Sequence, residues 1–368
     1  MKLPNIQILR ACAALMIVVY HCGIETGRLS AVVGGGKLFD EAAWGSGVPL
    51  FFAISGFIMV VTSARAFGSS SAAIDFMRRR LIRIAPLYWL VTTIALAGIL
   101  LMPSLSKAPP GDPLYVVASY LFWPYMRLTG DIRPLATPGW TLNLEMLFYV
   151  VFAVSLLFRR RVGLSLLFAS LGLLVAARVS GMLPGIALNF WGDPIVLGFL
   201  FGAAVGIAYV NGLRLSGLSA VMLIAIGFGI MFLSWAPTGA EDSLSLRLAE
   251  AAPATLVLIG IALGPQVDAS QNIWRFGLAV GNASYSLYLV QEFLLRLLSL
   301  SWFKGPLAIL PLWTFIPIGV TITVLVALMM YRYFENPVTR WLNGDKRRQS
   351  QRIVDRLRRP LARETAAV

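Results

Sequence analysis

The sequence predicts an all-α fold, a polytopic membrane-embedded bundle of about ten transmembrane helices. Hydrophobic residues make up 58% of the 368 residues, and charged residues make up only 13%. In a soluble globular protein about 25% of the residues are charged. The mean hydropathy is +0.77. This small number of polar side chains cannot cover the surface of a soluble globule, so lipid must cover much of it.

About ten apolar runs have the length of roughly 20 residues that a helix needs to cross a bilayer. They lie at 4–23, 46–64, 83–102, 139–158, 163–180, 193–210, 216–235, 251–265, 282–302 and 308–331. The stretch 115–126 is too short to span and is bounded by prolines, which predicts an interfacial or re-entrant segment. We therefore expect one transmembrane domain over 1–341 and a basic cytoplasmic tail over 342–368.

The charges of the loops predict the orientation. Arginines gather in the loop 65–82, in the turn 159–162 and in the tail, whereas the loops 24–45 and 236–250 carry more acidic than basic residues. Basic loops stay in the cytoplasm, so both termini are predicted to be cytoplasmic. The net charge of +14 follows from these loops and the tail. It favours contact with anionic lipid over a nucleic-acid partner.

The first apolar run carries two residues that lipid disfavours, in "NIQILRACAALMIVVYHCG". Arg10 and His21, the sole histidine, lie on one helix face about 16 Å apart along the axis. Such residues usually face the bundle interior and mark a functional path. The alternatives are an Arg10 that snorkels to the surface and a His21 bonded to a carbonyl. A pantetheine-like arm of an acyl donor has about the reach from one residue to the other.

The two cysteines of the same run suggest neither a disulfide nor a metal site. Cys12 and Cys22 lie about 15 Å apart along a helix, which is too far for a disulfide. One histidine with two distant cysteines does not make a zinc site.

The segment "FMRRRLIRIAPLYWL" places four arginines at the start of the third run. Guanidinium groups match the geometry of phosphate oxygens, so the cluster predicts either a phosphate site or a membrane anchor. Its members are Arg78, Arg79, Arg80 and Arg83.

The segment "PGWTLNLEMLFYV" enters the membrane from the opposite side. Glu145 sits about two turns into this helix, at a depth comparable to that of His21. A His–Glu pair orients and strengthens a general base, so we expect Glu145 to pair with His21. Trp140 is typical of an aromatic belt. Ser55 is either a packing notch between helices or a pocket residue.

Several sequence blocks resemble, in order, those of the membrane acyltransferase-3 family. They are "LRACAALMIVVYH", "FFAISGFIM", "RRRLIRIAPLYW", "WTLNLE", "NASYSLYLVQ" and "YRYFENP", and the resemblance extends from Asn5 to Trp341. The opening is most similar to the branch that modifies bacterial exopolysaccharides. The resemblance implies a ten-helix bundle that transfers an acyl group, usually acetyl from acetyl-CoA, to hydroxyls of cell-envelope or secreted carbohydrates.

The resemblance also implies roles for individual residues. Arg10 and His21 match the paired residues of the family's first helix, and Glu145 matches the acid of its tryptophan block. Gln291 stands where many members carry a histidine, and glutamine forms hydrogen bonds without titrating. The donor-handling segment of the family matches Arg78, Arg79, Arg80 and Arg83.

Together these observations predict an O-acyltransferase of the bacterial inner membrane. His21 acts as the base or as a transient acyl acceptor, with Glu145 and Arg10. Acetyl-CoA is the donor substrate, with no bound cofactor and no metal. The expected partners are an exopolysaccharide or lipid-linked carbohydrate acceptor, membrane lipid and polysaccharide synthesis proteins. The alternatives are a transporter of a small solute or acylated sugar, and a non-catalytic subunit of a polysaccharide synthesis complex. The candidate pocket residues are Ser55, Trp140, Tyr285, Tyr288 and Gln291.

Overall fold

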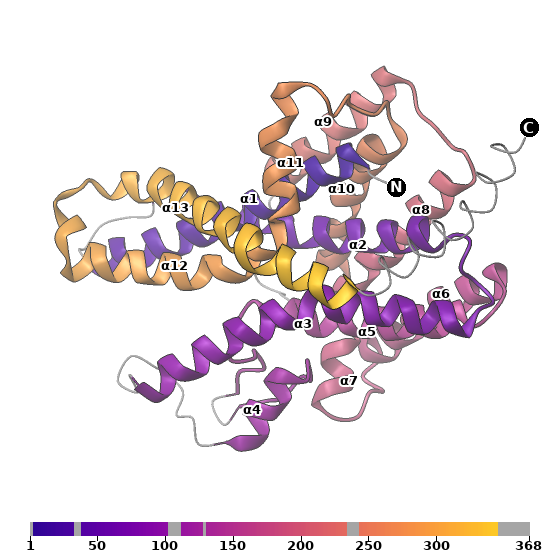
Figure 1. Ribbon diagram of the computed structural model, residues 1–368, viewed down its shortest axis with the longest axis horizontal. Helices are drawn as coiled ribbons and strands as arrows, with labels where there is room; N and C mark the ends of the chain where they lie inside the picture. The colour runs from indigo at the N-terminus through magenta and orange to yellow at the C-terminus, as the bar shows by residue number, and fades with distance from the viewer. Residues whose placement is uncertain (1–2, 33–37, 102–111, 128–129, 234–242, 345–368) are drawn as a thin grey trace, which may run out of the picture.

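The computed structural model describes residues 3–32, 38–101, 112–127, 130–233 and 243–344. Within these ranges the secondary structure is entirely helical (Figure 1). The longer helices are α1 (Pro4–Val32), α2 (Gly47–Ser63), α3 (Ser70–Leu101), α5 (Gly139–Leu156), α6 (Arg160–Val179), α8 (Leu197–Val210), α9 (Gly217–Leu233), α10 (Leu244–Leu263), α12 (Ser284–Lys304) and α13 (Phe315–Met330). The shorter elements are η1 (Ala42–Ser46), α4 (Pro113–Tyr120), α7 (Ile186–Trp191), η3 (Pro194–Val196), η4 (Asn272–Trp274), α11 (Arg275–Asn282), η5 (Pro306–Ile309), η6 (Leu312–Thr314) and the π-helical turn η7 (Tyr331–Glu335).

The structure confirms a multi-pass helical membrane protein. Seven helical segments of the described chain are long and apolar enough to cross a bilayer: Pro4–Ala31, Ala42–Ser63, Ser70–Leu101, Gly139–Leu156, Arg160–Val179, Leu244–Leu263 and Leu312–Gly344. Pro194–Val210 and Gly217–Leu233 are apolar but shorter. The remaining predicted run coincides with α12, which carries Gln291, Glu292 and Arg296. Every predicted run therefore falls on a helix, while a count of ten crossings stays a prediction.

The third helix starts earlier than hydropathy predicts. The apolar run begins at 83, with the arginines before it expected in a loop, but α3 begins at Ser70 and contains them all. Arginine and alanine are good helix formers, so the charged segment is helical although it is not apolar. Pro86 therefore lies in the middle of α3. At the other end of the chain the helix continues to Gly344, and the tail 345–368 lies outside the described residues.

Close helix crossings fix the centre of the bundle. A Cβ atom on Gly56 of α2 would lie 2.0 Å from the carbonyl oxygen of Phe199, and one on Gly202 of α8 would lie 1.8 Å from that of Ala53. Only glycine allows backbones to approach so closely. The ring of Phe199 stacks on Phe52 of α2 and Phe148 of α5, at centroid distances of 4.4 and 4.5 Å. Thus α2, α5 and α8 form one packed unit.

Helix α1 lies beside this unit and contacts α2, α11, α12 and α13. A Cβ on Gly47, the first residue of α2, would lie 2.5 Å from the carbonyl oxygen of Ala13 and 2.6 Å from a side-chain carbon of Ile17. The start of α2 is therefore level with residues 13–17 of α1. Figure 1 shows α12 and α13 side by side, extending together with α1.

The start of α1, the start of α12 and the last helix meet at one end of the bundle. The Gln7 amide donates to Asn282 Oδ1 at 2.6 Å, just before α12. Ser286 Oγ donates to Glu335 Oε2 at 2.5 Å, and Arg78, early in α3, donates to the carbonyl oxygen of Leu342 at 2.9 Å. We call this end the terminal side of the bundle and the other end the opposite side.

Candidate active site

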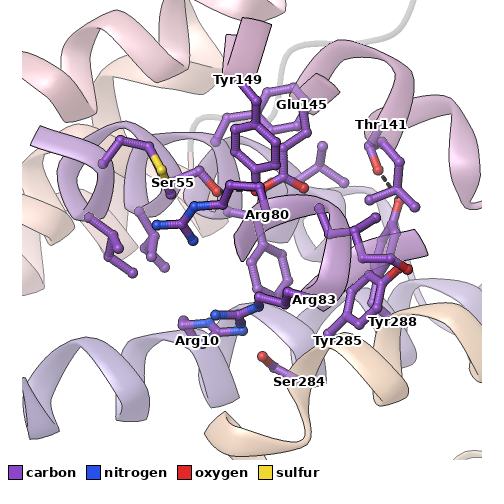
Figure 2. Close-up of a pocket in the computed structure, with 18 residues that line it drawn as sticks. Arg10, Ser55, Arg80, Arg83, Thr141, Glu145, Tyr149, Ser284, Tyr285 and Tyr288 are labelled. Carbon is purple, nitrogen blue, oxygen red and sulfur yellow. Dashed lines mark hydrogen bonds between the residues drawn. The ribbon is translucent and has the colours of Figure 1, made fainter. Parts of the chain in front are cut away.

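A cavity lies between α1, α2, α3, α5 and α12, within the membrane-spanning part of the bundle. It holds about 750 Å³ of space that atoms do not fill, including the part open to solvent. Its apolar walls come mainly from α2, whose Phe51, Ile54 and Met59 face it. Figure 2 shows its polar lining, which consists of Arg10, Ser55, Arg80, Arg83, Thr141, Glu145, Tyr149, Ser284, Tyr285 and Tyr288.

Three guanidinium groups enter this cavity from two helices. Arg10 comes from α1, and Arg80 and Arg83 come from one face of α3 because residues three apart are neighbours on a helix surface. Arg10 donates to Gln7 Oε1 at 3.0 Å. Across the described residues, none of the three forms a salt bridge. Most of their hydrogen-bond donors are therefore open to a ligand.

Arg80 is held by aromatic rings rather than by a carboxylate. Its guanidinium lies 5.3 Å from the centroid of the Phe76 ring and 5.7 Å from that of Tyr149. Its Nε atom is buried and has no hydrogen-bond partner in the described part of the chain. Such cation–π contacts orient a guanidinium without neutralising its charge.

Glu145 is the one carboxylate among the described residues that line the cavity. It accepts hydrogen bonds from Ser55 Oγ at 3.0 Å and from the Tyr149 hydroxyl. It also attracts Arg10 and Arg80 electrostatically. One carboxylate against three guanidinium groups leaves an excess of positive charge, which favours an anionic ligand.

Tyrosines of α12 tie this helix to the opposing wall. The Tyr288 hydroxyl donates to the carbonyl oxygen of Pro138 at 3.0 Å and lies 2.7 Å from Thr141 Oγ1 (Figure 2). The Tyr285 hydroxyl donates to the carbonyl oxygen of Ile84 at 2.7 Å. These bonds join α12 to α3 and α5 and so fix the width of the cavity.

A second carboxylate approaches the arginines from outside the lining. Glu335 ends the π-helical turn η7 and is 7% exposed. π-Turns often mark functional sites, and this one brings Glu335 close enough to act electrostatically on Arg10 and Arg83. The direct contact of Glu335 is with Ser286, whose hydroxyl donates to its carboxylate.

The expected pairing of Glu145 with His21 is wrong for this structure. The hydrogen bonds of Glu145 go to Ser55 and Tyr149, and His21 does not line the cavity. The prediction matches the two residues by depth in the membrane alone, whereas contact also requires helix faces that point at each other. His21 is half-buried and its ring contacts Tyr20 edge-on at 5.3 Å.

His21 nevertheless lies close to one end of the cavity along α1. Val48 and Phe51, near the start of α2, line the cavity, and Gly47 is level with Ile17. His21 is four residues beyond Ile17, or about 6 Å along the helix axis. His21 therefore lies along α1 beyond the end of the cavity that Val48 and Phe51 line, whereas Arg10 lines the cavity itself.

The structure divides the predicted arginine cluster. Arg80 and Arg83 line the cavity. Arg78 instead binds the carbonyl oxygen of Leu342 and lines a separate surface groove, while Arg79 is exposed. Successive residues of a helix point about 100° apart, so one helix face cannot present all four.

The other predicted pocket residues divide in the same way. Ser55, Tyr285 and Tyr288 line the cavity, whereas Trp140 and Gln291 do not. Trp140, near the start of α5, packs against the hydrophobic core. Gln291 is fully buried, and neither its amide nitrogen nor its amide oxygen has a hydrogen-bond partner in the described ranges.

Sequence reasoning misses three polar lining residues: Thr141, Tyr149 and Ser284. Tyr149 carries a usable signal, because it follows Glu145 by four residues and therefore shares its helix face. Thr141 and Ser284 are small hydroxyl residues in apolar runs and carry no comparable signal.

Comparison with known proteins decides the family. A family model described as an acyltransferase domain matches residues 3–332. The chain belongs to the acyltransferase-3 family. It is 32% identical over 321 residues to the exopolysaccharide production protein ExoZ of Rhizobium meliloti (strain 1021), which covers 84% of this chain and 94% of that protein. It is 24% identical over 325 residues to the acyltransferase MdmB of Streptomyces mycarofaciens, which covers 80% of this chain and 79% of that protein.

No solved structure matches the chain significantly. Family membership and the apolar helices together make this acyltransferase-3 protein a membrane O-acyltransferase. The resemblance found in the sequence blocks is confirmed.

Proposed function

We propose that this acyltransferase transfers an acetyl group from acetyl-CoA to a hydroxyl of an exopolysaccharide or of its lipid-linked precursor, in the bacterial inner membrane. The observation that carries the proposal is the cavity with three guanidinium groups and no salt bridge among its described residues. The similarity to ExoZ, an exopolysaccharide production protein, supports the acceptor class.

The donor binds with its phosphates at Arg80, Arg83 and Arg10. Guanidinium forks bind phosphate oxygens through paired hydrogen bonds, and a phosphate-bearing ligand would neutralise the excess charge of the cavity. Arg78 and Arg79 lie outside the lining, so we assign them no contact with the bound donor. From Arg10 the pantetheine arm runs along α1 toward His21, about 16 Å away.

At His21 the acceptor hydroxyl loses its proton and attacks the thioester. A neutral imidazole takes the hydroxyl proton while the oxygen forms a bond to the acetyl carbonyl carbon. The carbon–sulfur bond then breaks, and the CoA thiolate takes the proton from the imidazolium. In the alternative route, the imidazole itself carries the acetyl group before the hydroxyl receives it. Both routes yield an acetyl ester and CoA. The role of Glu145 is to hold Ser55 and Tyr149 and to limit the positive charge near the donor.

This mechanism requires the terminal side to be cytoplasmic, because acetyl-CoA is a cytoplasmic metabolite. We therefore propose ten crossings with both termini in the cytoplasm, in line with the basic loops. Membrane lipid surrounds the bundle, and polysaccharide synthesis proteins deliver the acceptor. Reporter fusions after Glu41 and after Glu250 should give extracytoplasmic signals, and a cytoplasmic signal at both positions would contradict this topology.

The proposed function is tested with detergent-purified protein, acetyl-CoA and polysaccharide from a strain that lacks this chain. We expect release of free CoA thiol that depends on the polysaccharide, and new acetyl signals in its proton NMR spectrum. Arg79→Ala serves as a control for Arg83→Ala, because both arginines belong to α3 but only Arg83 lines the cavity. Thiol release without any acetyl signal on the polysaccharide would contradict the proposed acceptor.

A further inference from the structure

A second group of charged side chains surrounds His21 on the opposite side of the bundle. Arg28 lies on α1, two turns beyond His21, and Arg133 lies in the segment before α5. The contacts Gln7–Asn282 and Glu25–Arg296 set α12 alongside α1, so Glu292, one turn before Arg296, lies level with His21. Tyr288, one turn before Glu292, binds the carbonyl oxygen of Pro138 in the segment that carries Arg133, and both arginines act electrostatically on His21 and on Glu292. The two arginines therefore stand near the proposed reactive residue and near a carboxylate on another helix.

The arginines of this group differ in how far they are neutralised. Glu25, which is buried, binds Arg28 directly and contacts Arg296 at 3.4 Å. Arg133 is exposed, and its guanidinium forms no hydrogen bond or salt bridge within the described residues. Within the described residues, Arg133 is therefore the arginine of this group whose guanidinium has no carboxylate partner.

The backbone of Arg133 is held although its side chain is unbound. Its amide donates to Asp131 Oδ1 at 3.1 Å, and its carbonyl oxygen accepts from the Tyr115 hydroxyl at 3.2 Å. Tyr115 in turn is contacted by Arg127, whose guanidinium carbon lies 4.5 Å from the centroid of the tyrosine ring. The anchored backbone fixes the region that this guanidinium can reach, although the side chain itself stays free to rotate.

Glu292 adds an unused acceptor to the same region. Its Oε2 atom is buried and has no hydrogen-bond partner in the described part of the chain. A carboxylate oxygen accepts hydrogen bonds from sugar hydroxyls, and an unbound guanidinium binds an oxyanion. A ligand with both groups would satisfy both residues, and an acidic sugar has both.

We propose that Arg133, Arg28 and Glu292 form an acceptor-binding site that recognises an oxyanion on the acceptor carbohydrate and places a neighbouring hydroxyl at His21. The oxyanion is the carboxylate of an acidic sugar or the phosphate of a lipid-linked sugar. This inference rests on the proposed function, since it assigns the acceptor side of the same reaction. The two substrates then bind at separate places, the donor phosphates at Arg80 and Arg83 and the acceptor oxyanion at Arg133.

The test compares a neutral acceptor with two acceptors that each carry an anionic group. Purified wild-type protein and Arg133→Gln receive radiolabelled acetyl-CoA and one of three acceptors: an oligosaccharide that contains glucuronate, the same oligosaccharide with the carboxylate reduced to an alcohol, or a polyprenyl-diphosphate-linked sugar. Arg65→Gln is the control, because Arg65 is also exposed but lies on the terminal side between α2 and α3. His21→Gln is run in parallel.

We expect the wild type and Arg65→Gln to prefer one of the anionic acceptors over the neutral oligosaccharide. Arg133→Gln should raise the acceptor KM for that substrate by roughly tenfold or more, because it removes a charge-assisted hydrogen bond. It should leave the KM for acetyl-CoA and the rate with the neutral acceptor unchanged. Preference for the glucuronate oligosaccharide identifies a carboxylate, and preference for the diphosphate-linked sugar identifies a phosphate.

Three results would overturn the inference. If the wild type uses neutral and anionic acceptors equally, or if Arg133→Gln keeps the wild-type preference, these residues do not recognise an oxyanion, while the proposed function stands. If the wild type transfers acetyl to none of the acceptors and not to native polysaccharide either, the proposed function fails and this inference fails with it. Transfer at the wild-type rate in His21→Gln would also overturn the inference, because the acceptor hydroxyl would then not be placed at His21.

Discussion

Two arginine-rich regions of this protein are built in opposite ways. In the first, which joins α6, η3 and α10, Arg178 contacts Asp193 at 3.1 Å, and Arg247 contacts Asp193 at 3.4 Å and Glu250 at 3.1 Å. Two guanidinium groups thus meet two carboxylates. In the second, the cavity, three guanidinium groups share one lining carboxylate and form no salt bridge among the described residues.

The difference separates a structural role from a binding role. Asp193 also caps η3 by accepting from the backbone amide of Ile195 at 2.9 Å, so its network closes on itself and joins three elements. An unpaired guanidinium within a membrane bundle costs free energy. Three of them would be retained only if a ligand binds them and neutralises their charge. The number of arginines in a region therefore does not identify the binding site. The absence of carboxylate partners for those arginines does.

The largest expected effect comes from the proposed reactive residue. His21→Gln should lower the rate of acetyl transfer by about a hundred- to ten-thousand-fold, because glutamine forms hydrogen bonds but cannot take a proton. Binding of acetyl-CoA, measured by isothermal titration calorimetry, should remain, because His21 lies outside the cavity lining. Transfer at the wild-type rate in the purified variant would show that the histidine is structural.

The next effect distinguishes the two kinds of arginine on one helix. Arg83→Ala and Arg80→Ala should each raise the KM for acetyl-CoA by roughly ten- to a hundredfold through the loss of charge-assisted hydrogen bonds to phosphate. The matched control Arg79→Ala should leave this KM unchanged, because Arg79 is exposed away from the cavity. Equal effects of all three variants would indicate that the cluster acts as a membrane anchor.

Mutation of the paired network should lower the stability of the protein and leave donor binding unchanged. Asp193→Asn removes the charge that two arginines share, so we expect a loss of about 1–3 kcal/mol of stability and a lower midpoint of thermal unfolding. The KM for acetyl-CoA in the folded protein should not change. A raised KM with unchanged stability would mean that this network, rather than the cavity, serves the donor.

The smallest effect concerns the support of Glu145. Tyr149→Phe removes one hydrogen bond to this carboxylate while the bond from Ser55 remains. We expect the kcat/KM for acetyl-CoA to fall by about two- to tenfold, the equivalent of one net hydrogen bond. Tyr333→Phe, which changes a tyrosine that is 74% exposed, is the control and should behave like the wild type.

The sequence predicts the fold class and part of the cavity for simple physical reasons. Ionisable residues in apolar runs usually point inward, so the apolar runs alone single out Arg10 and Glu145, and both residues line the cavity. The partner of Glu145 is not predictable in this way, because a sequence gives depth along a helix but not the direction in which neighbouring helices face. For the same reason the sequence indicates Ser55 only as a candidate, while its bond to Glu145 follows from the α2–α5 packing.

The prediction of helix boundaries fails for a different reason. Hydropathy alone places the start of the third run at 83, but α3 begins at Ser70. The reason is that arginine is a good helix former although its side chain is not apolar. The resulting helix carries Arg78 and Arg79 away from the cavity and Arg80 and Arg83 into it. Residue spacing predicts this division only when the helix is taken as continuous through the arginines.

The most direct test of the central claim, that the unpaired guanidinium groups hold the donor phosphates, uses a donor that lacks those phosphates. The quantity to measure is the affinity of the wild type and of Arg83→Ala for acetyl-CoA and for S-acetyl-pantetheine, by isothermal titration calorimetry. We expect Arg83→Ala to weaken acetyl-CoA binding by roughly tenfold or more and to leave the weaker binding of S-acetyl-pantetheine unchanged. An equal loss of affinity for both donors would contradict the claim, because it would show that Arg83 shapes the cavity without contacting phosphate.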